Sequence, residues 1–167
     1  MSIPTPIGEN YDAEYGLLDY RGKRVLDIGA DYGSTAQFFL WSGAEKVIAV
    51  ESNKRFYNRL VKNSQRIAGI VPVYLHIKNP QEVASLIVKF MPHIIKVDCE
   101  GCEVHLLNVP DWVFGIPESY VIETHTLKLE RQFLEKFAKN GYTIRGLNPY
   151  AWWCLGTVKI ITAQRIL

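Results

Sequence analysis

Four carboxylates and one histidine stand where predicted strands end, and these side chains are well suited to acid–base or ligand-binding chemistry. They are Asp27, Glu51, Asp98, Glu123 and His125, each at or just beyond an apolar run. In a doubly wound sheet the carboxyl ends of the parallel strands meet at one edge, where ligands bind. Each acid by itself could instead cap a helix or a turn. Together they predict a polar, acidic ligand site at that edge.

A glycine-containing loop follows the first of these acids. The predicted strand 25–28 leads into this loop, and a predicted helix over 34–41 follows it. Its residues are Gly29, Ala30, Asp31, Tyr32 and Gly33. Glycine permits a tight turn and close approach of a ligand to the backbone, and free amides at a helix N-terminus favour an anionic or strongly polar group. The loop therefore predicts a nucleotide-like ligand.

The carboxylate of Glu51 narrows the class of ligand. It lies twenty-four residues after Asp27 at the end of the second predicted strand, where a carboxylate can accept hydrogen bonds from both hydroxyls of an adenosine ribose. The loop is not Gly-x-Gly-x-x-Gly, no Gly-Lys-Ser/Thr follows it, and Asp31 would oppose a pyrophosphate. A cofactor with a positive charge and an ammonium group would suit Asp27, Asp31 and Asp98.

The elements that must position these residues alternate along the chain. Apolar runs predict strands over 25–28, 46–50, 71–77, 93–98, 119–125, 142–146 and 157–163, and helical patterns separate most of them, over 34–41, 54–67, 80–90, 104–107 and 130–139. The last two strands have no helix between them, which predicts a hairpin joined by 147–156. We expect a single α/β domain over 25–167, Rossmann-like and doubly wound, with a mostly parallel seven-stranded sheet and an antiparallel C-terminal edge hairpin. Residues 1–24 are an N-terminal arm and lead-in that could lie over a ligand site.

The bulk charge of the chain leaves its partner open. The chain has 167 residues, 48% of them hydrophobic, and a formal net charge of +2. That charge is too mild to indicate a nucleic-acid binder. A basic stripe of Arg55, Arg59, Lys62 and Arg66 could track a phosphate backbone, although a solvated outer helix face is the preferred interpretation. No signal peptide or apolar run of membrane-spanning length is present, so we expect a cytoplasmic protein without membrane contact.

The cysteines are Cys99, Cys102 and Cys154. Their odd number and lack of a spacing framework favour a reducing compartment over a disulfide scaffold. Cys99 and Cys102 form a Cys-x-x-Cys pair, yet no second pair completes a four-ligand zinc site and no aromatic residue precedes Cys99. We interpret these cysteines as packing residues.

Three segments of the chain form a set: Val25-Leu-Asp-Ile-Gly-Ala-Asp-Tyr-Gly33, Val47-Ile-Ala-Val-Glu51-Ser-Asn and Ile95-Lys-Val-Asp98-Cys-Glu-Gly101-Cys-Glu103. In this order and spacing, over about residues 25–125, they resemble the class I S-adenosylmethionine-dependent methyltransferases. The third segment resembles the Ile-Asp-x-Glu-Gly-x-Glu segment of the FkbM-type methyltransferases.

The resemblance implies S-adenosyl-L-methionine as the cofactor and assigns parts of it to residues. Asp27 and the loop Gly29–Gly33, with its residues Ala30, Asp31 and Tyr32, would hold the methionine part. Glu51, with Ser52 beside it, would bind the ribose. The stretch from Ile77 to Asn79 would lie along the adenine. Asp98 would face the methionine end and the incoming acceptor.

Methyl transfer from a sulfonium is an in-line displacement, so the protein mainly positions the acceptor and removes a proton from a hydroxyl. The predicted catalytic residues are Asp98, Glu123 and His125. His125 is the natural base near neutral pH, unless it is a strand-end histidine bonded to backbone. Alternatively, Asp98 and Glu123 could bind magnesium or calcium, although no metal belongs to the preferred prediction.

The acceptor is less well marked than the cofactor. The chain lacks the Asn/Asp-Pro-Pro-Tyr sequence of enzymes that methylate amide or ring amine nitrogens, so a small-molecule or glycan hydroxyl is preferred, with RNA as a lesser option. A methyltransferase-like protein that binds cofactor without chemistry is the alternative. Aromatic residues could form a substrate wall or cover the core or an oligomer interface; they are Tyr11, Tyr15, Tyr150, Trp152 and Trp153. The oligomeric state is not indicated.

Overall fold

A computed structural model describes residues 2–6, 10–149 and 159–165 of the chain. Its centre is a seven-stranded sheet in the order β3-β2-β1-β4-β5-β7-β6. The first five strands in the sequence are parallel, and β7 runs antiparallel between β5 and β6. The strands are β1 Arg24–Ile28, β2 Lys46–Glu51, β3 Ile70–Tyr74, β4 Ile94–Val97, β5 Ser119–Thr124, β6 Thr143–Pro149 and β7 Lys159–Gln164. The predicted fold class is confirmed.

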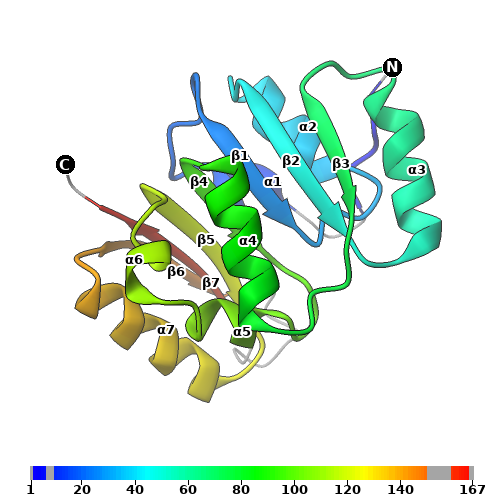
Figure 1. Cartoon of the computed structure of the whole chain (residues 1–167). Coiled ribbons are helices and arrows are strands. Elements are labelled where there is room, and N and C mark those ends of the chain that lie inside the picture. The colour runs from blue at the N-terminus through cyan, green and yellow to red at the C-terminus, as the bar shows by residue number, and fades with distance from the viewer. Residues whose placement is uncertain (1, 7–9, 150–158, 166–167) are drawn as a thin grey trace.

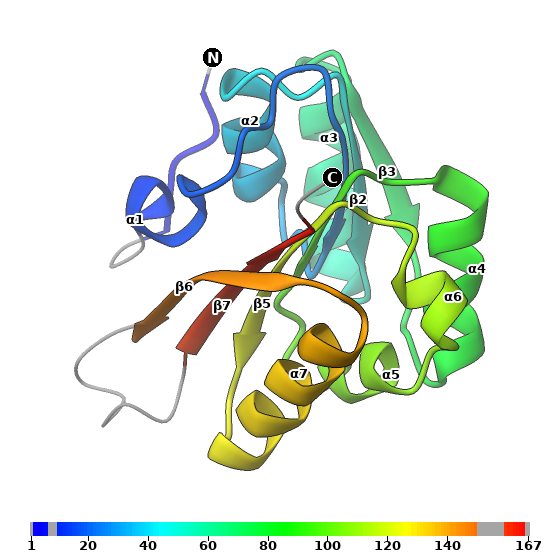
Figure 2. The same cartoon turned by 90° about the vertical axis from the view of Figure 1, so that its left-hand side faces the viewer.

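Helices cover both faces of this sheet. Figures 1 and 2 show α1, α2 and α3 on one face and α4 to α7 on the other. Their bounds are α1 Tyr11–Tyr15, α2 Ser34–Trp41, α3 Lys54–Ser64, α4 Pro80–Phe90, α5 Glu103–Leu107, α6 Asp111–Phe114 and α7 Leu127–Lys139. Because both faces are buried, the central strands are nearly continuous apolar runs.

Alternate residues of each strand enter different cores. Leu26 and Ile28 of β1 pack with Val83 of α4 and Phe133 of α7. Their neighbour Val25 joins the other core, which contains residues of α1, α2 and α3. This double-sided packing fixes the plane of the sheet. It therefore also fixes where the strand ends deliver their polar residues.

The predicted element boundaries were wrong at several points. Strand β3 ends at Tyr74, three residues before its predicted end, and the four-residue helix α6 was not predicted. Helix α7 begins at Leu127 because the Thr126 hydroxyl caps it by accepting a hydrogen bond from the Leu129 amide. The predicted C-terminal hairpin is confirmed, and its second strand also pairs with β5.

The N-terminal arm runs beside α2. The Ile3 amide donates to the side-chain oxygen of Gln37 at 2.7 Å, and the amide nitrogen of Gln37 donates to the Ile3 carbonyl at 3.0 Å. Tyr11 and Tyr15 are buried in the core against Phe38. Of the two interpretations offered for these residues, the structure supports a place in the core and not one in a substrate wall. The other residues suggested for that wall, Tyr150, Trp152 and Trp153, lie outside the described residues.

Within the described part of the chain, no helix is both long and apolar enough to cross a membrane.

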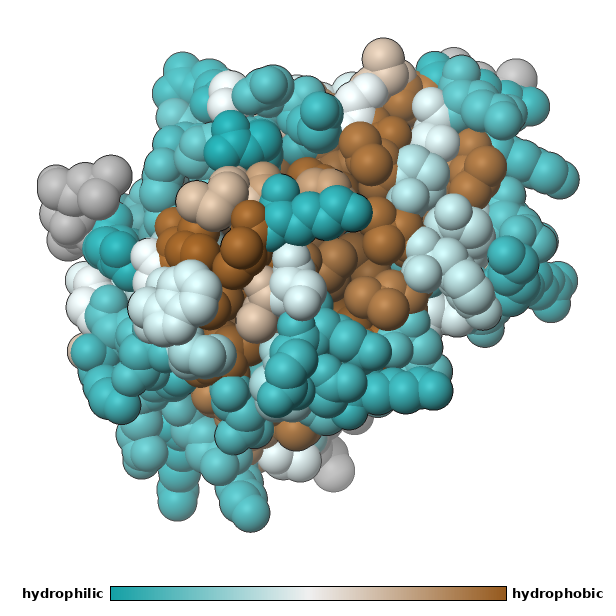
Figure 3. Space-filling view, viewed as in Figure 1, coloured by the Kyte–Doolittle hydropathy of each residue, from teal (hydrophilic) through white to brown (hydrophobic). Residues whose placement is uncertain are grey.

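Figure 3 shows one face of the molecule, with apolar residues exposed over β2 and β3 between α4 and α3. The right-hand edge of this view, over α3, is mostly hydrophilic.

Candidate functional site

A cavity of about 760 Å³ opens where β1, β2 and β4 end. Seven of the predicted site residues line it: Gly29, Asp31, Glu51, Ser52, Ile77, Asp98 and Glu123. Apolar side chains that were not predicted, Phe56 and Leu75 among them, also line it. The cavity therefore combines an acidic wall with an apolar one, as a nucleoside ligand requires.

The six other predicted residues, Asp27 and His125 among them, do not line this cavity. Ala30 is buried beneath the loop, Gly33 is the left-handed N-cap of α2, and Asn79 caps α4 by accepting from the Glu82 amide at 3.0 Å. Tyr32 lines a separate groove beside α3. Direct contact of these four residues with a cofactor stays a prediction. They do shape the segments that border the cavity.

Asp27 lies under the glycine loop, with a fully buried side chain. Thr35 Oγ1 donates a hydrogen bond to it at 2.6 Å, and Lys96 Nζ lies 3.2 Å from its other oxygen. Burial raises the pKa of Asp27, and Lys96 opposes that rise. The predicted contact between Asp27 and the cofactor stays a prediction, because in this structure its partners are protein groups.

Lys96 is a site residue that sequence reasoning missed. Its ammonium donates to the Gly29 carbonyl at 2.9 Å and lies 3.8 Å from the Asp98 carboxylate. Burial would lower the pKa of Lys96, but the carboxylates of Asp27 and Asp98 outweigh it and raise that pKa. A lysine within the otherwise apolar run Ile94–Val97 was the available signal. Lys96 thus holds the glycine loop and offsets part of the acidic charge.

Glu51 fixes the loops on either side of it. One carboxylate oxygen accepts from the Asp31 amide at 2.9 Å, and the other accepts from the Asn53 amide at 2.5 Å. Each oxygen retains a lone pair for a further donor. Asp31 lines the cavity. Partial burial of its carboxyl group and the negative charge of Glu51 raise the pKa of Asp31 to about 6. Glu51 is therefore held in place and can still accept hydrogen bonds.

Gly29 is the position where the two strand-end loops meet most closely. Its φ is +80°, and an added Cβ would lie 1.6 Å from the Asp98 carbonyl oxygen. No other residue type fits without displacing that backbone. The close contact is what brings Asp98 up to the glycine loop.

The loop after β4 contains a disulfide between Cys99 and Cys102. Both cysteines pack against the core, as interpreted, but the disulfide between them was not predicted. The tight turn between β4 and α5 brings their Cα atoms to 5.6 Å, within disulfide range, and this turn was not visible in the spacing alone. Glu100 and Gly101, between the two cysteines, both have positive φ angles.

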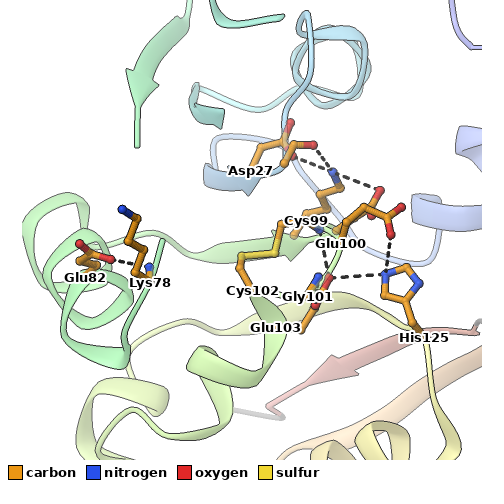
Figure 4. The surroundings of a disulfide bond; sticks show 12 residues. Asp27, Lys78, Glu82, Cys99, Glu100, Gly101, Cys102, Glu103 and His125 are labelled. Atoms are coloured by element: carbon orange, nitrogen blue, oxygen red, sulfur yellow. Dashed lines mark hydrogen bonds and ion pairs between the residues drawn. A yellow bond between two sulfur atoms is a disulfide. The ribbon is translucent and has the colours of Figure 1, made fainter. Parts of the chain in front are cut away.

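Glu103 ties this loop together from below (Figure 4). Its buried carboxylate accepts from the amides of Cys99 at 3.1 Å and Gly101 at 2.8 Å. Glu103 is the last residue of the sequence segment 95–103 described above, but no role was predicted for it. With the disulfide, Glu103 defines the cavity wall formed by residues 98–102.

The three predicted catalytic residues do come together. Asp98, Glu123 and His125 each offer a ligand atom, and these atoms lie within 4.8 Å of one another. Burial and the Asp98 carboxylate, which shares a hydrogen bond with Glu123, raise the pKa of Glu123 to about 9. His125 Nδ1 lies 3.9 Å from Glu123, and its Nε2 lies 3.6 Å from Glu103. Two oxygen donors and one nitrogen donor in this geometry could also hold a divalent cation.

Two viral proteins are similar to this chain in sequence. No family model matches the chain. It is 33% identical over 114 residues to uncharacterized protein 65 of Sulfolobus islandicus filamentous virus, covering 64% of this chain and 66% of that protein. It is 31% identical over 98 residues to uncharacterized protein 158B of Sulfolobus islandicus rod-shaped virus 1, covering 58% of each. The chain thus spans less than two thirds of both relatives.

Solved structures match over nearly the whole chain. A protein of the NADB-Rossmann superfamily from Streptococcus agalactiae superposes with a TM-score of 0.72 at 16% identity, over 99% of this chain and 70% of that one. Precorrin-6y C5,15-methyltransferase from Geobacter metallireducens gives 0.64 at 16%, over 92% and 85%. Fibrillarin from Aeropyrum pernix, with natively bound S-adenosyl-L-methionine, gives 0.61 at 14%, over 87% and 68%. This chain has the Rossmann-like fold of these structures. In this fold the cavity lies at the carboxyl edge of the parallel strands.

Proposed function

We propose that this protein is an S-adenosylmethionine-dependent methyltransferase that methylates a hydroxyl oxygen of a small molecule or glycan. The observation that carries the proposal is the position of Glu51. It ends β2 on the wall of the cavity, both of its oxygens are held by backbone amides, and each oxygen can accept one more hydrogen bond. Two adjacent ribose hydroxyls are the donors that such a carboxylate suits.

The charge of the cavity supports a cationic ligand. Beside the protonated Glu123, four carboxylates line it, those of Asp31, Glu51, Asp98 and Glu100, and Lys78 is the one lysine among its lining residues. A sulfonium with an ammonium group is favoured by this excess of negative charge. A pyrophosphate is disfavoured because Asp31 projects from the glycine loop, where a dinucleotide phosphate would have to lie.

The apolar wall supports an adenine. Ile77, Leu75 and Phe56 line the cavity on the side of β3 and α3, next to Glu51. Ile77 is 5% exposed and is one of the residues that line the cavity. In this arrangement an adenine would lie against the apolar side chains and its ribose beside the Glu51 carboxylate. The FkbM-type assignment rests on the segment 95–103 and is part of the proposal.

When bound, S-adenosylmethionine supplies a methyl group activated on its sulfonium. The chain orients the acceptor hydroxyl and takes its proton. Asp98 and His125 are the proposed proton acceptors, since the raised pKa of Glu123 keeps that side chain protonated at neutral pH. Protonated Glu123 can donate its hydrogen bond to Asp98 and so holds that carboxylate in position.

Calorimetry with S-adenosylmethionine tests the cofactor assignment. Glu51→Gln should raise the dissociation constant about tenfold or more, because one charge-assisted hydrogen bond is lost. Glu45→Gln is the matched control, because Glu45 is exposed and immediately precedes the opposite end of the same strand. Unchanged affinity in Glu51→Gln would refute the ribose assignment.

A labelled-methyl screen over sugars, phenols and RNA then tests the transfer. Asp98→Asn should lower the transfer rate far more than it lowers cofactor affinity. Binding without transfer to any acceptor would instead favour a protein that binds cofactor but performs no chemistry.

A further inference from the structure

The basic residues of this chain are unevenly distributed. The segment 52–81 contains six lysines and arginines and no aspartate or glutamate, which leaves thirteen basic and seventeen acidic residues elsewhere. The mild net charge therefore conceals a basic segment within an otherwise acidic chain. That segment comprises α3, β3 and the connection to α4, at the edge of the sheet.

Four of these cations lie along one side of α3 and the turn after it. Arg55, Arg59, Lys62 and Arg66 are exposed and recur at intervals of four, three and four residues, which places them in one row of roughly 16 Å. Arg55, Arg59 and Lys62 make no ion pair within the part of the chain that the structure describes. By contrast, Lys136 and Lys159 each pair with an acid.

A groove of about 430 Å³ runs beside this row. Arg59, Lys62 and Arg66 line it from α3 and the turn after it, and the arm residues 2–4 and Tyr32 of the glycine loop line it as well. The ring of Tyr32 also contacts that of Phe56, with the ring centroids 6.5 Å apart. The carbonyl of Tyr32 accepts a hydrogen bond from Asn63 of α3 at 2.7 Å. Tyr32 follows Asp31 in the glycine loop, and Asp31 lines the cofactor cavity. The groove and the cavity therefore lie on either side of this loop.

A lipid bilayer and a nucleic acid are two anionic partners that a basic surface could bind, and they make different demands on it. An interfacial helix binds a bilayer by inserting its apolar face. The apolar side of α3 is not available, since Leu60 is fully buried against the sheet. A row of exposed cations beside a tyrosine is instead an arrangement that binds the backbone and bases of single-stranded nucleic acid.

We propose that the row Arg55, Arg59, Lys62 and Arg66 and its adjoining groove bind the phosphate backbone of a single nucleic-acid strand. Tyr32 offers a surface on which one base stacks. The proposal does not rest on the methyltransferase function, because the surface is complete without a cofactor.

Fluorescence anisotropy with a labelled single-stranded RNA of about 12 nucleotides, and with DNA of the same sequence, tests this proposal. Binding should weaken as salt rises, by a log–log slope of about 0.7 for each phosphate contacted. The double variant Arg59→Glu/Lys62→Glu should raise the dissociation constant at least tenfold and reduce the slope by about 1.4. Arg59→Gln/Lys62→Gln should show a smaller loss in the same direction.

The control carries the same change of charge elsewhere. Lys128→Glu/Arg131→Glu alters two exposed cations of α7 and should leave the affinity within about twofold. Circular dichroism and thermal midpoints confirm that all variants fold. Equal losses in both double variants, or no binding to either strand at about 50 mM salt, would overturn the proposal. Binding to phosphatidylserine vesicles but not to RNA or DNA would overturn it in favour of a membrane surface.

Discussion

Glu123 retains its proton at neutral pH because of where the fold puts it. Glu123 is 7% exposed and lies beside the Asp98 carboxylate, so its ionisation would place a poorly solvated negative charge next to another one. With a pKa of about 9 in the native state, Glu123 binds a proton that the unfolded chain releases near pH 4.5. The native state therefore binds more protons across that interval.

This difference sets the sign of a pH dependence. Stability contributed by a carboxyl with a raised native pKa falls as pH increases between the two pKa values. We predict that Glu123→Gln, which carries no titrating proton, gains stability relative to the wild type as the pH rises. From about pH 5.5 to 8.5 the gain should approach, at most, about 4 kcal/mol. Urea unfolding at several pH values measures it.

Glu135→Gln, an exposed change on α7, is the control for this series. Its free energy of unfolding should parallel that of the wild type at every pH. A pH-independent difference between Glu123→Gln and the wild type would contradict the prediction.

The residue contacts differ in how far the sequence could predict them. Asp98, Glu123 and His125 were predictable as a group because they lie at or just beyond the ends of β4 and β5, which are adjacent and parallel. The pair of Asp27 and Lys96 was not, because it depends on strand register. The two residues are opposite each other in the β1–β4 ladder, and residue types alone do not give that register.

At the scale of elements, the short connection between β4 and α5 has the most effect on the cavity. It holds the Cys99–Cys102 disulfide, two residues with positive φ, and Glu103 beneath them. Helix α5 is five residues long and could not anchor this turn by itself. The disulfide and the buried carboxylate therefore supply the constraint that the helix lacks.

We predict that Cys99→Ser/Cys102→Ser destabilises the chain by about 2 kcal/mol, the chain-entropy value for so short a closed loop. The affinity for S-adenosylmethionine should fall as well, because both cysteines line the cavity. Urea unfolding and calorimetry measure the two effects. Dithiothreitol should produce the same losses in the wild type and no change in the double variant.

Thiol titration of the denatured protein provides the independent check. Prior reduction should expose two additional thiols in the wild type. If the thiol count were the same before and after reduction, the disulfide would be absent and the prediction would be wrong.

Helices with clear boundary residues were predicted best, and the four-residue helix α6 was missed. Helices α2 and α4 match their predicted ranges because each combines apolar periodicity with a glycine or proline boundary. Helix α6 has four residues, too few to show a period. The place of β7 between β5 and β6 is a long-range pairing, so local patterns could predict the hairpin but not which strand it joins.

At the scale of the whole molecule, the cavity joins parts of the chain that are far apart in sequence. Its lining extends from Ile28 to Glu123, and it includes the ends of β1, β2 and β5 as well as the loops after β3 and β4. A ligand bound there contacts elements that pack into both cores. Occupation of the cavity should therefore stabilise the fold as a unit and not one loop alone.

The demethylated cofactor S-adenosylhomocysteine makes this measurable without any acceptor. At a concentration one hundred times its dissociation constant, it should add about 2.7 kcal/mol to the free energy of unfolding. For a chain of this length the thermal midpoint should rise by roughly 5–10 °C. Differential scanning fluorimetry records the shift, and Glu51→Gln should reduce it at the same ligand concentration.

A nicotinamide dinucleotide is the informative comparison, because it shares the adenosine and differs in carrying a pyrophosphate. Asp31 extends from the loop where that group would lie, and Glu51 and Asp98 add to the negative charge there. The dinucleotide should therefore leave the midpoint unchanged. A shift with the dinucleotide and none with S-adenosylhomocysteine would reverse the cofactor assignment, since Glu51 would then bind the ribose of a different cofactor and the Asp31 argument would fail with it.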